Sequence, residues 1–334
     1  MHAGSNYTLR EFLYWTRREI YWLVLLALIL TSLYELLSLK WLALPWLPVA
    51  LLGTAAAFLV AFKNNASYGR LWEARIIWGA IVNSSRTWGI MAKDFISGSS
   101  SEAERKKIQQ ILIYRHIAWL TALRFQLRET RTWESINKSY NMEYRKLFPV
   151  EEKEKLLADA LKPFLNEEEY AYVMSKSNKA TQIISLQSQH LRKLHEQGLL
   201  ENFRFVNMEQ QLADLYDQQG KCERIKNFPY PRQFATINLF FIRLFILLVP
   251  FGMLMEFEKL GEGLVWLTVP FSTMVAWVFN SIEKIGEATE NPFEGGANDV
   301  PITALCRTIE IDLREMLDEA NIPEPLKPVN KILM

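Results

Sequence analysis

The chain of 334 residues has little cysteine, little histidine and almost no net charge. Its two cysteines, Cys222 and Cys306, exclude a disulfide framework and a paired-cysteine zinc site. Its four histidines are scattered, and the two nearest in sequence, five residues apart, fall on different faces of a helix. A net charge of +1 argues against nucleic-acid binding driven by bulk charge. We therefore expect no metal site and no nucleic-acid partner.

Common enzyme motifs are missing as well. The sequence contains no HExxH, no GxSxG and no phosphate-binding GxxxxGK[ST]. It also shows no alternating strand pattern of useful length and no internal repeat. The first 15 residues lack the basic and apolar stretches of a signal peptide, so we expect them in the mature protein. These absences predict an all-α protein without catalytic residues or a cofactor.

Long apolar runs are what the sequence does contain. Half of the residues are hydrophobic although the mean hydropathy is −0.02, so apolar and polar residues must be segregated along the chain. An α-helix of about 20 residues crosses the roughly 30 Å of hydrocarbon in a bilayer. Four runs have about this length and predict membrane-spanning helices: Ile20–Leu37, Trp41–Phe62, Phe234–Met255 and Leu264–Ile282.

Basic residues predict the orientation of these spans. Of the 38 Lys and Arg residues, 27 lie in the segment Lys63–Arg232, whereas each short turn between paired spans carries one. The positive-inside rule then places this segment and both termini in the cytoplasm, with the chain in the cell membrane. Arg243 is the one basic residue well inside a span. A charged side chain at that depth is energetically unfavourable in lipid, so we expect Arg243 to face protein or water.

The spans divide the chain into four parts. Residues 1–62 hold the N-terminal segment and two spans, and 63–232 form a helical cytosolic region. Residues 233–282 hold the other two spans, and 283–334 form a cytosolic helix and tail. Within this last part, Asp299 precedes Pro301 and is expected to cap a helix that begins there.

The second span carries a candidate constriction. Thr54, Phe58 and Phe62 are spaced four residues apart and share one helix face. The cluster Gly53–Ala57 is rich in small residues and is expected to pack between subunits. Several copies of this helix around an axis would form a narrow apolar neck that gates by losing water. The alternative is that the two phenylalanines simply pack in a core.

Two long motifs resemble the bestrophin family. The first, KNNASYGRLWEARIIWGAIVNSSRTW, begins at Lys63, and the second, FNSIEKIGEATENPFEGGANDVPITALCRTIE, begins at Phe279. Together with the four spans, the similarity covers nearly the whole chain. The matching residues are Asn64, Ser67, Tyr68, Arg70, Glu73, Ala74, Arg75, Trp78, Gly79 and Arg86, and then Asn291, Pro292, Phe293 and Asp299.

The resemblance implies an ion channel built from identical subunits. Family members are homopentamers with one axial pore, a neck lined by the second span and a cytosolic aperture. The neck residues map onto Thr54, Phe58 and Phe62, and Thr54 departs from the usual apolar residue. The aperture maps onto Phe203 by its distance from Gly198. The partners implied are the protein itself, inorganic ions and the lipid bilayer.

Two groups of charged residues allow alternatives. Animal members bind calcium in an acidic cluster after the NPF turn, but here that cluster keeps only Glu294 and Asp299, so we expect no calcium clasp. Arg70, Glu73 and Arg75 follow the neck and either line a charged vestibule or pair between helices.

We therefore expect an all-α membrane protein with four spans continuous with a cytosolic helical bundle, assembled as a ring. Its expected function is passive conduction of chloride or similar anions. A monovalent cation channel is the first alternative, and a non-conducting membrane scaffold or receptor is the second.

Overall fold

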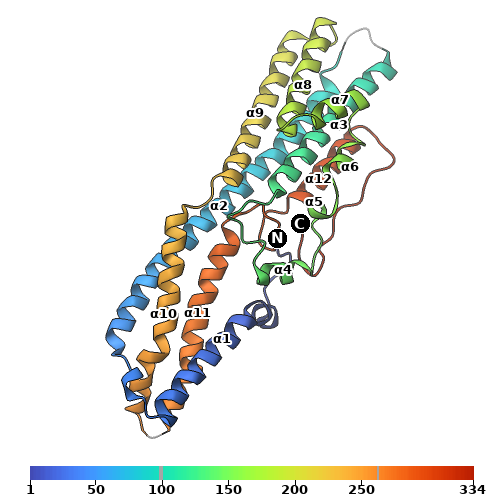
Figure 1. Ribbon diagram of the computed structural model, residues 1–334. Helices are drawn as coiled ribbons and strands as arrows, with labels where there is room; N and C mark the ends of the chain where they lie inside the picture. The colour runs from blue at the N-terminus through green and yellow to red at the C-terminus, as the bar shows by residue number, and fades with distance from the viewer. Residues whose placement is uncertain (98–100, 262) are drawn as a thin grey trace.

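The computed structural model describes residues 1–97, 101–261 and 263–334, and these form helices and loops with isolated β-bridges but no named strand. Figure 1 shows an elongated molecule with long helices at one end and a helical bundle at the other. The helices are α1 (Leu9–Leu36), α2 (Trp46–Asp94), α3 (Glu102–Arg128), α4 (Ser139–Arg145), α5 (Glu151–Glu154), α6 (Leu157–Leu161), α7 (Glu167–Met174), α8 (Lys179–Glu196), α9 (Asn202–Asn227), α10 (Arg232–Glu258), α11 (Thr268–Thr289) and α12 (Ile302–Met316).

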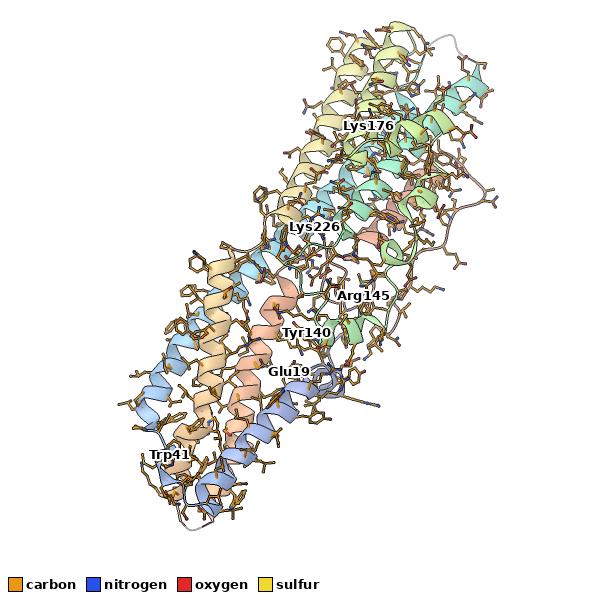
Figure 2. The ribbon with its side chains drawn as sticks, viewed as in Figure 1. Glu19, Trp41, Tyr140, Arg145, Lys176 and Lys226 are labelled. Carbon is orange, nitrogen blue, oxygen red and sulfur yellow. The ribbon has the colours of Figure 1, made fainter. Side chains whose placement is uncertain are left out.

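The prediction of four membrane helices is confirmed. Among the described residues, the helices long and apolar enough to cross a bilayer are α1, the helical stretch that contains α2, α10, and the stretch that contains α11. They form the membrane half of the molecule, in which α2 and α11 each pack on α10. At its end, the turn between α1 and α2 places Ser38 in the left-handed conformation (φ 51°) and leaves Trp41 exposed (Figure 2).

The first two spans depart furthest from the predicted bounds. The first begins at Leu9 rather than Ile20, because the side chain of Thr8 accepts from the backbone of Glu11 and the Glu11 carboxylate accepts from the backbone of Thr8. The second begins at Trp46 because Pro45, whose ring fixes φ, stands at the N-cap. It then continues unbroken to Asp94, so one helix joins the membrane half to the bundle.

The bundle half has its own core. Its helices α2, α3, α8, α9 and α12 enclose large buried side chains, among them Trp78, Trp88 and Trp119. Two of these three buried indole N–H groups have an acceptor. Trp119 Nε1 donates to Gln219 Oε1 (2.8 Å), and Trp88 Nε1 approaches the carbonyl oxygen of Leu112 (3.4 Å). These polar contacts fix α9 and α3 against one another and against α2.

The last residues of the chain are extended, as a tail, but their end is packed. Ile332 and Met334 are buried beside Phe148 and Val150, and Ala304 N–H donates to the Met334 carbonyl oxygen (2.7 Å). This contact lies at the junction between the membrane half and the bundle half, where the two ends of the chain meet (Figure 1). The segment therefore braces α12 rather than extending into solvent.

Candidate ion pathway

The predicted neck residues lie on the surface of the single chain. Phe58 is 64% exposed and Phe62 is 70% exposed, and Thr54 is exposed beside them with its hydroxyl donating to the Ala50 carbonyl oxygen (3.0 Å). The opposite face of α2 buries Val49, Ala56 and Val60 against α10. The neck face of α2 therefore points away from its own bundle.

Some of the small residues of α2 pack within their own subunit, contrary to the prediction. Gly53 faces Phe245 of α10, and a Cβ placed on it would lie 2.6 Å from the ring. Ala56 is fully buried within the chain. The expectation that the whole Gly53–Ala57 cluster packs between subunits is therefore wrong for these two residues, whereas Ala55 and Ala57 are exposed.

A buried ion pair follows the neck directly. Lys63 of α2 pairs with Glu283 of α11, and Asn238 of α10 donates to the same carboxylate (2.8 Å). All three side chains are buried, so the pair is screened little by water. We name this group the three-helix lock. It fixes the rotation of α2 relative to α10 and α11, and hence the direction in which Phe58 and Phe62 point.

The charged residues beyond the lock tie α2 to its neighbours. Arg70 donates to the backbone carbonyl oxygens of Ile225 (2.8 Å), Phe228 (2.9 Å) and Glu290 (2.9 Å). These carbonyls belong to the end of α9, the link to α10 and the end of α11. Arg70 thus connects three segments by binding their backbone carbonyl groups. Burial lowers the pKa of its guanidinium group. The sequence expectation of an ion pair does not describe it.

Other residues of the first motif divide between the interior and the surface. Glu73 forms an ion pair with Arg224 of α9, and Arg75 lies over the ring of Trp72 (5.7 Å to its centroid). The remaining contacts are these: Asn64 donates to the Ile282 carbonyl oxygen (3.0 Å), Ser67 and Trp78 are buried, and Tyr68 is 55% exposed and stacked on Trp72.

The NPF turn anchors the loop after α11 in the bundle core. Phe293 is 1% exposed, the Pro292 carbonyl oxygen accepts from Val300 N–H (3.2 Å), and Asn291 is buried. Asp299 does not cap α12, which corrects the sequence expectation. Its Oδ2 accepts from the N–H groups of Gly295 (2.7 Å) and Gly296 (3.0 Å), whereas α12 begins after Pro301 without a side-chain cap.

The two acidic residues of this loop already have protein partners. Glu294 accepts from the backbone and hydroxyl of Ser135 (3.0 and 2.8 Å), and Arg128 lies against Asp299 Oδ2 (3.4 Å). Burial raises the pKa of Glu294 to about 8 and also raises the pKa of Asp299. A guanidinium therefore stands beside the carboxylate that a calcium ion would need, and a protonated Glu294 is a poor ligand. This arrangement does not fit a calcium clasp.

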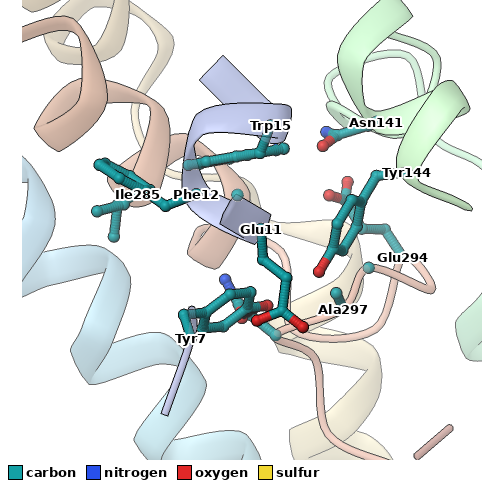
Figure 3. Close-up of a pocket in the computed structure, with 12 residues that line it drawn as sticks. Tyr7, Glu11, Phe12, Trp15, Asn141, Tyr144, Ile285, Glu294 and Ala297 are labelled. Carbon is teal, nitrogen blue, oxygen red and sulfur yellow. Dashed lines mark hydrogen bonds between the residues drawn. The ribbon is translucent and has the colours of Figure 1, made fainter. Parts of the chain in front are cut away.

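A cavity of about 310 Å³ lies beside this loop (Figure 3). Its walls come from the start of α1, from α4, from the end of α11 and from the loop itself. Tyr7, Trp15 and Tyr144 give it an aromatic character, and Glu11 and Glu294 reach its lining. It lies where the membrane half meets the bundle.

The predicted aperture residue lies far from the neck. Phe203 is 76% exposed in the first turn of α9, which Glu201 caps by accepting from the N–H groups of Phe203 (3.1 Å) and Arg204 (3.2 Å). Gly198 ends the preceding helix with φ 74°. This α8–α9 tip stands at the end of the molecule opposite Trp41 (Figures 1 and 2). The structure does not bring Phe203 near Phe58.

The sequence predicted neither the three-helix lock nor the backbone contacts of Arg70. Lys63 and Glu283 lie at the ends of two apolar runs separated by about 220 residues, and nothing local links them. Asn238, which shares its apolar run with Arg243 as the second strongly polar residue, was the available signal. A polar side chain in a span needs a partner, but the sequence does not say which.

Comparison with known proteins gives a consistent result. Residues 15–315 match the family described as Bacterial/Fungal Bestrophin protein. The chain is 28% identical over 281 residues to the voltage-dependent anion channel-forming protein YneE of Escherichia coli K12, covering 84% of this chain and 80% of that protein. It is 27% identical to a protein of the same description, mll4386, from Mesorhizobium japonicum, covering 85% and 78%.

A solved structure agrees with these relatives. The crystal structure of a bacterial bestrophin homologue from Klebsiella pneumoniae superimposes with a TM-score of 0.73 at 25% identity, covering 91% of this chain and 99% of that one.

Proposed function

Since this chain belongs to the bestrophin family, a family of ion channels and not of enzymes, we propose that it conducts anions through a pore shared by several identical subunits. The observation that carries the proposal is the exposed row of Thr54, Phe58 and Phe62 on a long helix that crosses from the membrane half into the bundle. The relatives named as anion-channel-forming proteins support chloride or a similar anion as the permeant ion.

A ring is required because one chain has only one neck face. In a single chain, the exposed face of α2 can line only one side of a passage. A closed passage therefore needs several copies of α2 arranged around an axis. The bestrophin resemblance supplies the number five. In this arrangement both termini and the bundle half lie in the cytoplasm of a cell whose membrane holds the spans, in agreement with the basic residues between Lys63 and Arg232.

The neck supplies the gate. Rings of Phe58 and Phe62 offer a hydrated ion nothing to replace its water, so a narrow neck blocks conduction until it widens. The edges of aromatic rings carry partial positive charge and favour an anion over a cation during passage. Phe203 forms a second ring at the exit of the bundle half, which sorts ions by size.

One experiment tests the function. The purified protein is reconstituted into liposomes with a potassium chloride gradient, and the reversal potential is measured. We expect conduction with a reversal potential close to the equilibrium potential of chloride. A value close to that of potassium would identify the cation channel, and a stable chain without flux would identify the scaffold. The protein without a gradient serves as the control.

A further inference from the structure

Arg243 is an unusual residue in the middle of α10. It is exposed on the single chain, and it lies two residues from Phe245, about 200° around the helix. The face that holds Ile242, Phe245 and Val249 is buried against α2, so Arg243 points away from its own bundle. Asn238, the other strongly polar residue in this span, has Glu283 as its partner. Within residues 1–97, 101–261 and 263–334, no hydrogen bond or ion pair reaches the Arg243 guanidinium.

The depth of Arg243 excludes an easy escape to water. The apolar run of α10 extends from Phe234 to Met255, so Arg243 lies roughly 14 Å from one end and roughly 18 Å from the other along the helix axis. An arginine near a span end can extend its head to the interface, but one near the centre must find protein or a water-filled passage. A lipid-facing position is therefore strongly unfavourable.

The surface that can receive Arg243 lies on α2. Phe245 touches Gly53, so Arg243 is level with the next few residues of the antiparallel α2, at the height of Thr54. Beside the neck residues, α2 presents small side chains at Ala50, Ala57 and Ala61, spaced along one face. The outer face of α10 presents large ones, Phe240 and Leu247, on either side of Arg243. Large side chains fit a strip of small ones.

Thr54 completes the fit chemically. Its hydroxyl hydrogen is used toward the Ala50 carbonyl oxygen (3.0 Å), which leaves the oxygen free to accept from a guanidinium. Thr54 is also the neck position at which this chain departs from the apolar pattern. An arginine on α10 and a hydroxyl on α2 therefore both lie on outward-facing sides of one chain. Two adjacent copies can bring them together.

We propose that Arg243 docks on α2 of the neighbouring subunit, donates to that subunit's Thr54, and sets the anion selectivity of the neck. The inference rests on the proposed ring of subunits. Each guanidinium stands immediately behind the neck lining in a medium of low dielectric constant, where its charge is screened little. A ring of such charges raises the local concentration of anions and repels cations. The ligand of this site is thus a small inorganic anion in transit.

Cross-linking tests the docking. Two chains are co-expressed, one carrying Arg243→Cys and the other carrying Ala57→Cys, and a bifunctional maleimide is added in the membrane. We expect a dimer on a denaturing gel. The control replaces Ala57→Cys with Ala56→Cys, which faces the chain's own α10 and should give no dimer. Equal yields from both partners, or no dimer from either, would overturn the docking.

Reversal potentials test the selectivity. In a potassium chloride gradient, Arg243→Gln should lower the chloride-to-potassium permeability ratio at least fivefold, whereas Arg243→Lys should keep most of it. Thr54→Val, which removes the acceptor at nearly constant volume, should lower the ratio by a smaller factor. An Arg243→Gln channel with the wild-type ratio would refute the inference and leave the anion channel intact. A wild-type protein without chloride conduction would instead refute the proposed function. Should Arg243→Gln fail to assemble, an unchanged ratio in Thr54→Val would refute the inference.

Discussion

Phe58 and Phe62 lie just before Lys63 on α2, and the environment of the two rings is opposite to that of the lysine. The two rings are exposed, and the ammonium group is buried against Glu283. If all outer sides of this span faced lipid, the direction in which the Phe58 and Phe62 rings point would have little consequence for function. Because burial of Lys63 fixes the rotation of the helix, the rings are held in one direction, and this makes them testable as lining residues.

Replacing Phe58 and Phe62 with Ala should raise open probability and current while the ring stays assembled, because the apolar barrier is removed. Size-exclusion profiles and single-channel currents on both single variants and the double variant measure this. Phe245→Ala is the matched control, since Phe245 is buried against Gly53 and its loss should cost about 3–5 kcal/mol of stability. If the neck variants lose assembly as that control does, the two rings are core residues and not pore lining.

Glu294 gives a prediction about pH. Its pKa is raised from 4.5 to about 8 in the folded protein, mainly by burial, so folding favours its protonated form. A raised pKa contributes stability that is complete below pH 4.5 and is lost as the pH rises to about 8. Glu294→Gln keeps the shape without the proton equilibrium.

The thermal midpoint of the wild type relative to Glu294→Gln should therefore fall between pH 4.5 and pH 8 and stay level above it. The measurement is thermal unfolding in detergent at a constant heating rate. Exposed Glu154→Gln serves as the control and should change little across the same range. Parallel curves for wild type and Glu294→Gln would show that the carboxyl group is ionised in the folded protein at neutral pH.

At the scale of elements, the three-helix lock joins α2, α10 and α11. Breaking a buried ion pair by removing one partner leaves an uncompensated charge and costs about 3–5 kcal/mol. Lys63→Met should therefore destabilise the protein strongly, and Lys63→Met combined with Glu283→Leu should recover much of the loss. Thermal unfolding of both variants measures the difference. If the double variant is no more stable than the single one, Glu283 is held mainly by Asn238 and not by Lys63.

The sequence predicted the spans because these depend on local hydrophobicity. It placed the start of α1 about ten residues late, because charged residues interrupt the apolar ones in the first three turns of that helix. Propensity and periodicity are properties of short windows, and these elements follow from them.

Partners distant in sequence were beyond that reasoning. Asp299 was expected to cap α12 because it precedes Pro301, but two glycine N–H groups and Arg128 compete for it in the folded loop. Arg70 was expected among charges, yet it binds three backbone carbonyls that only the assembled fold brings together. The helices that carry the candidate site residues could be predicted, but most of the contacts of these residues could not.

At the scale of the whole molecule, the proposed ring would place the two predicted constrictions in series. The proposed neck residues lie on α2 in the membrane half, and Phe203 lies in the first turn of α9, which begins at the far tip of the bundle, so an ion that passed both would travel most of the length of the subunit (Figure 1). Separation of the two allows the tasks to be divided, with gating at the neck and selection by size at the tip.

Phe203→Ala tests this division. A ring of Phe203 side chains facing water has few packing partners, so the variant should keep a particle of several times the 39.0 kDa of one chain, five times by the family's stoichiometry. Its wider exit should raise the permeability of large anions relative to chloride, whereas open probability should stay near that of the wild type because the neck is unchanged. Mass measurement of the detergent-solubilised particle and reversal potentials with anions of increasing size give both readouts. Met208→Ala, five residues further along α9 and fully buried, is the control that should reduce stability without widening the exit. A Phe203→Ala protein that loses its oligomer while keeping wild-type permeability ratios would place Phe203 in a subunit contact and leave the neck as the sole constriction.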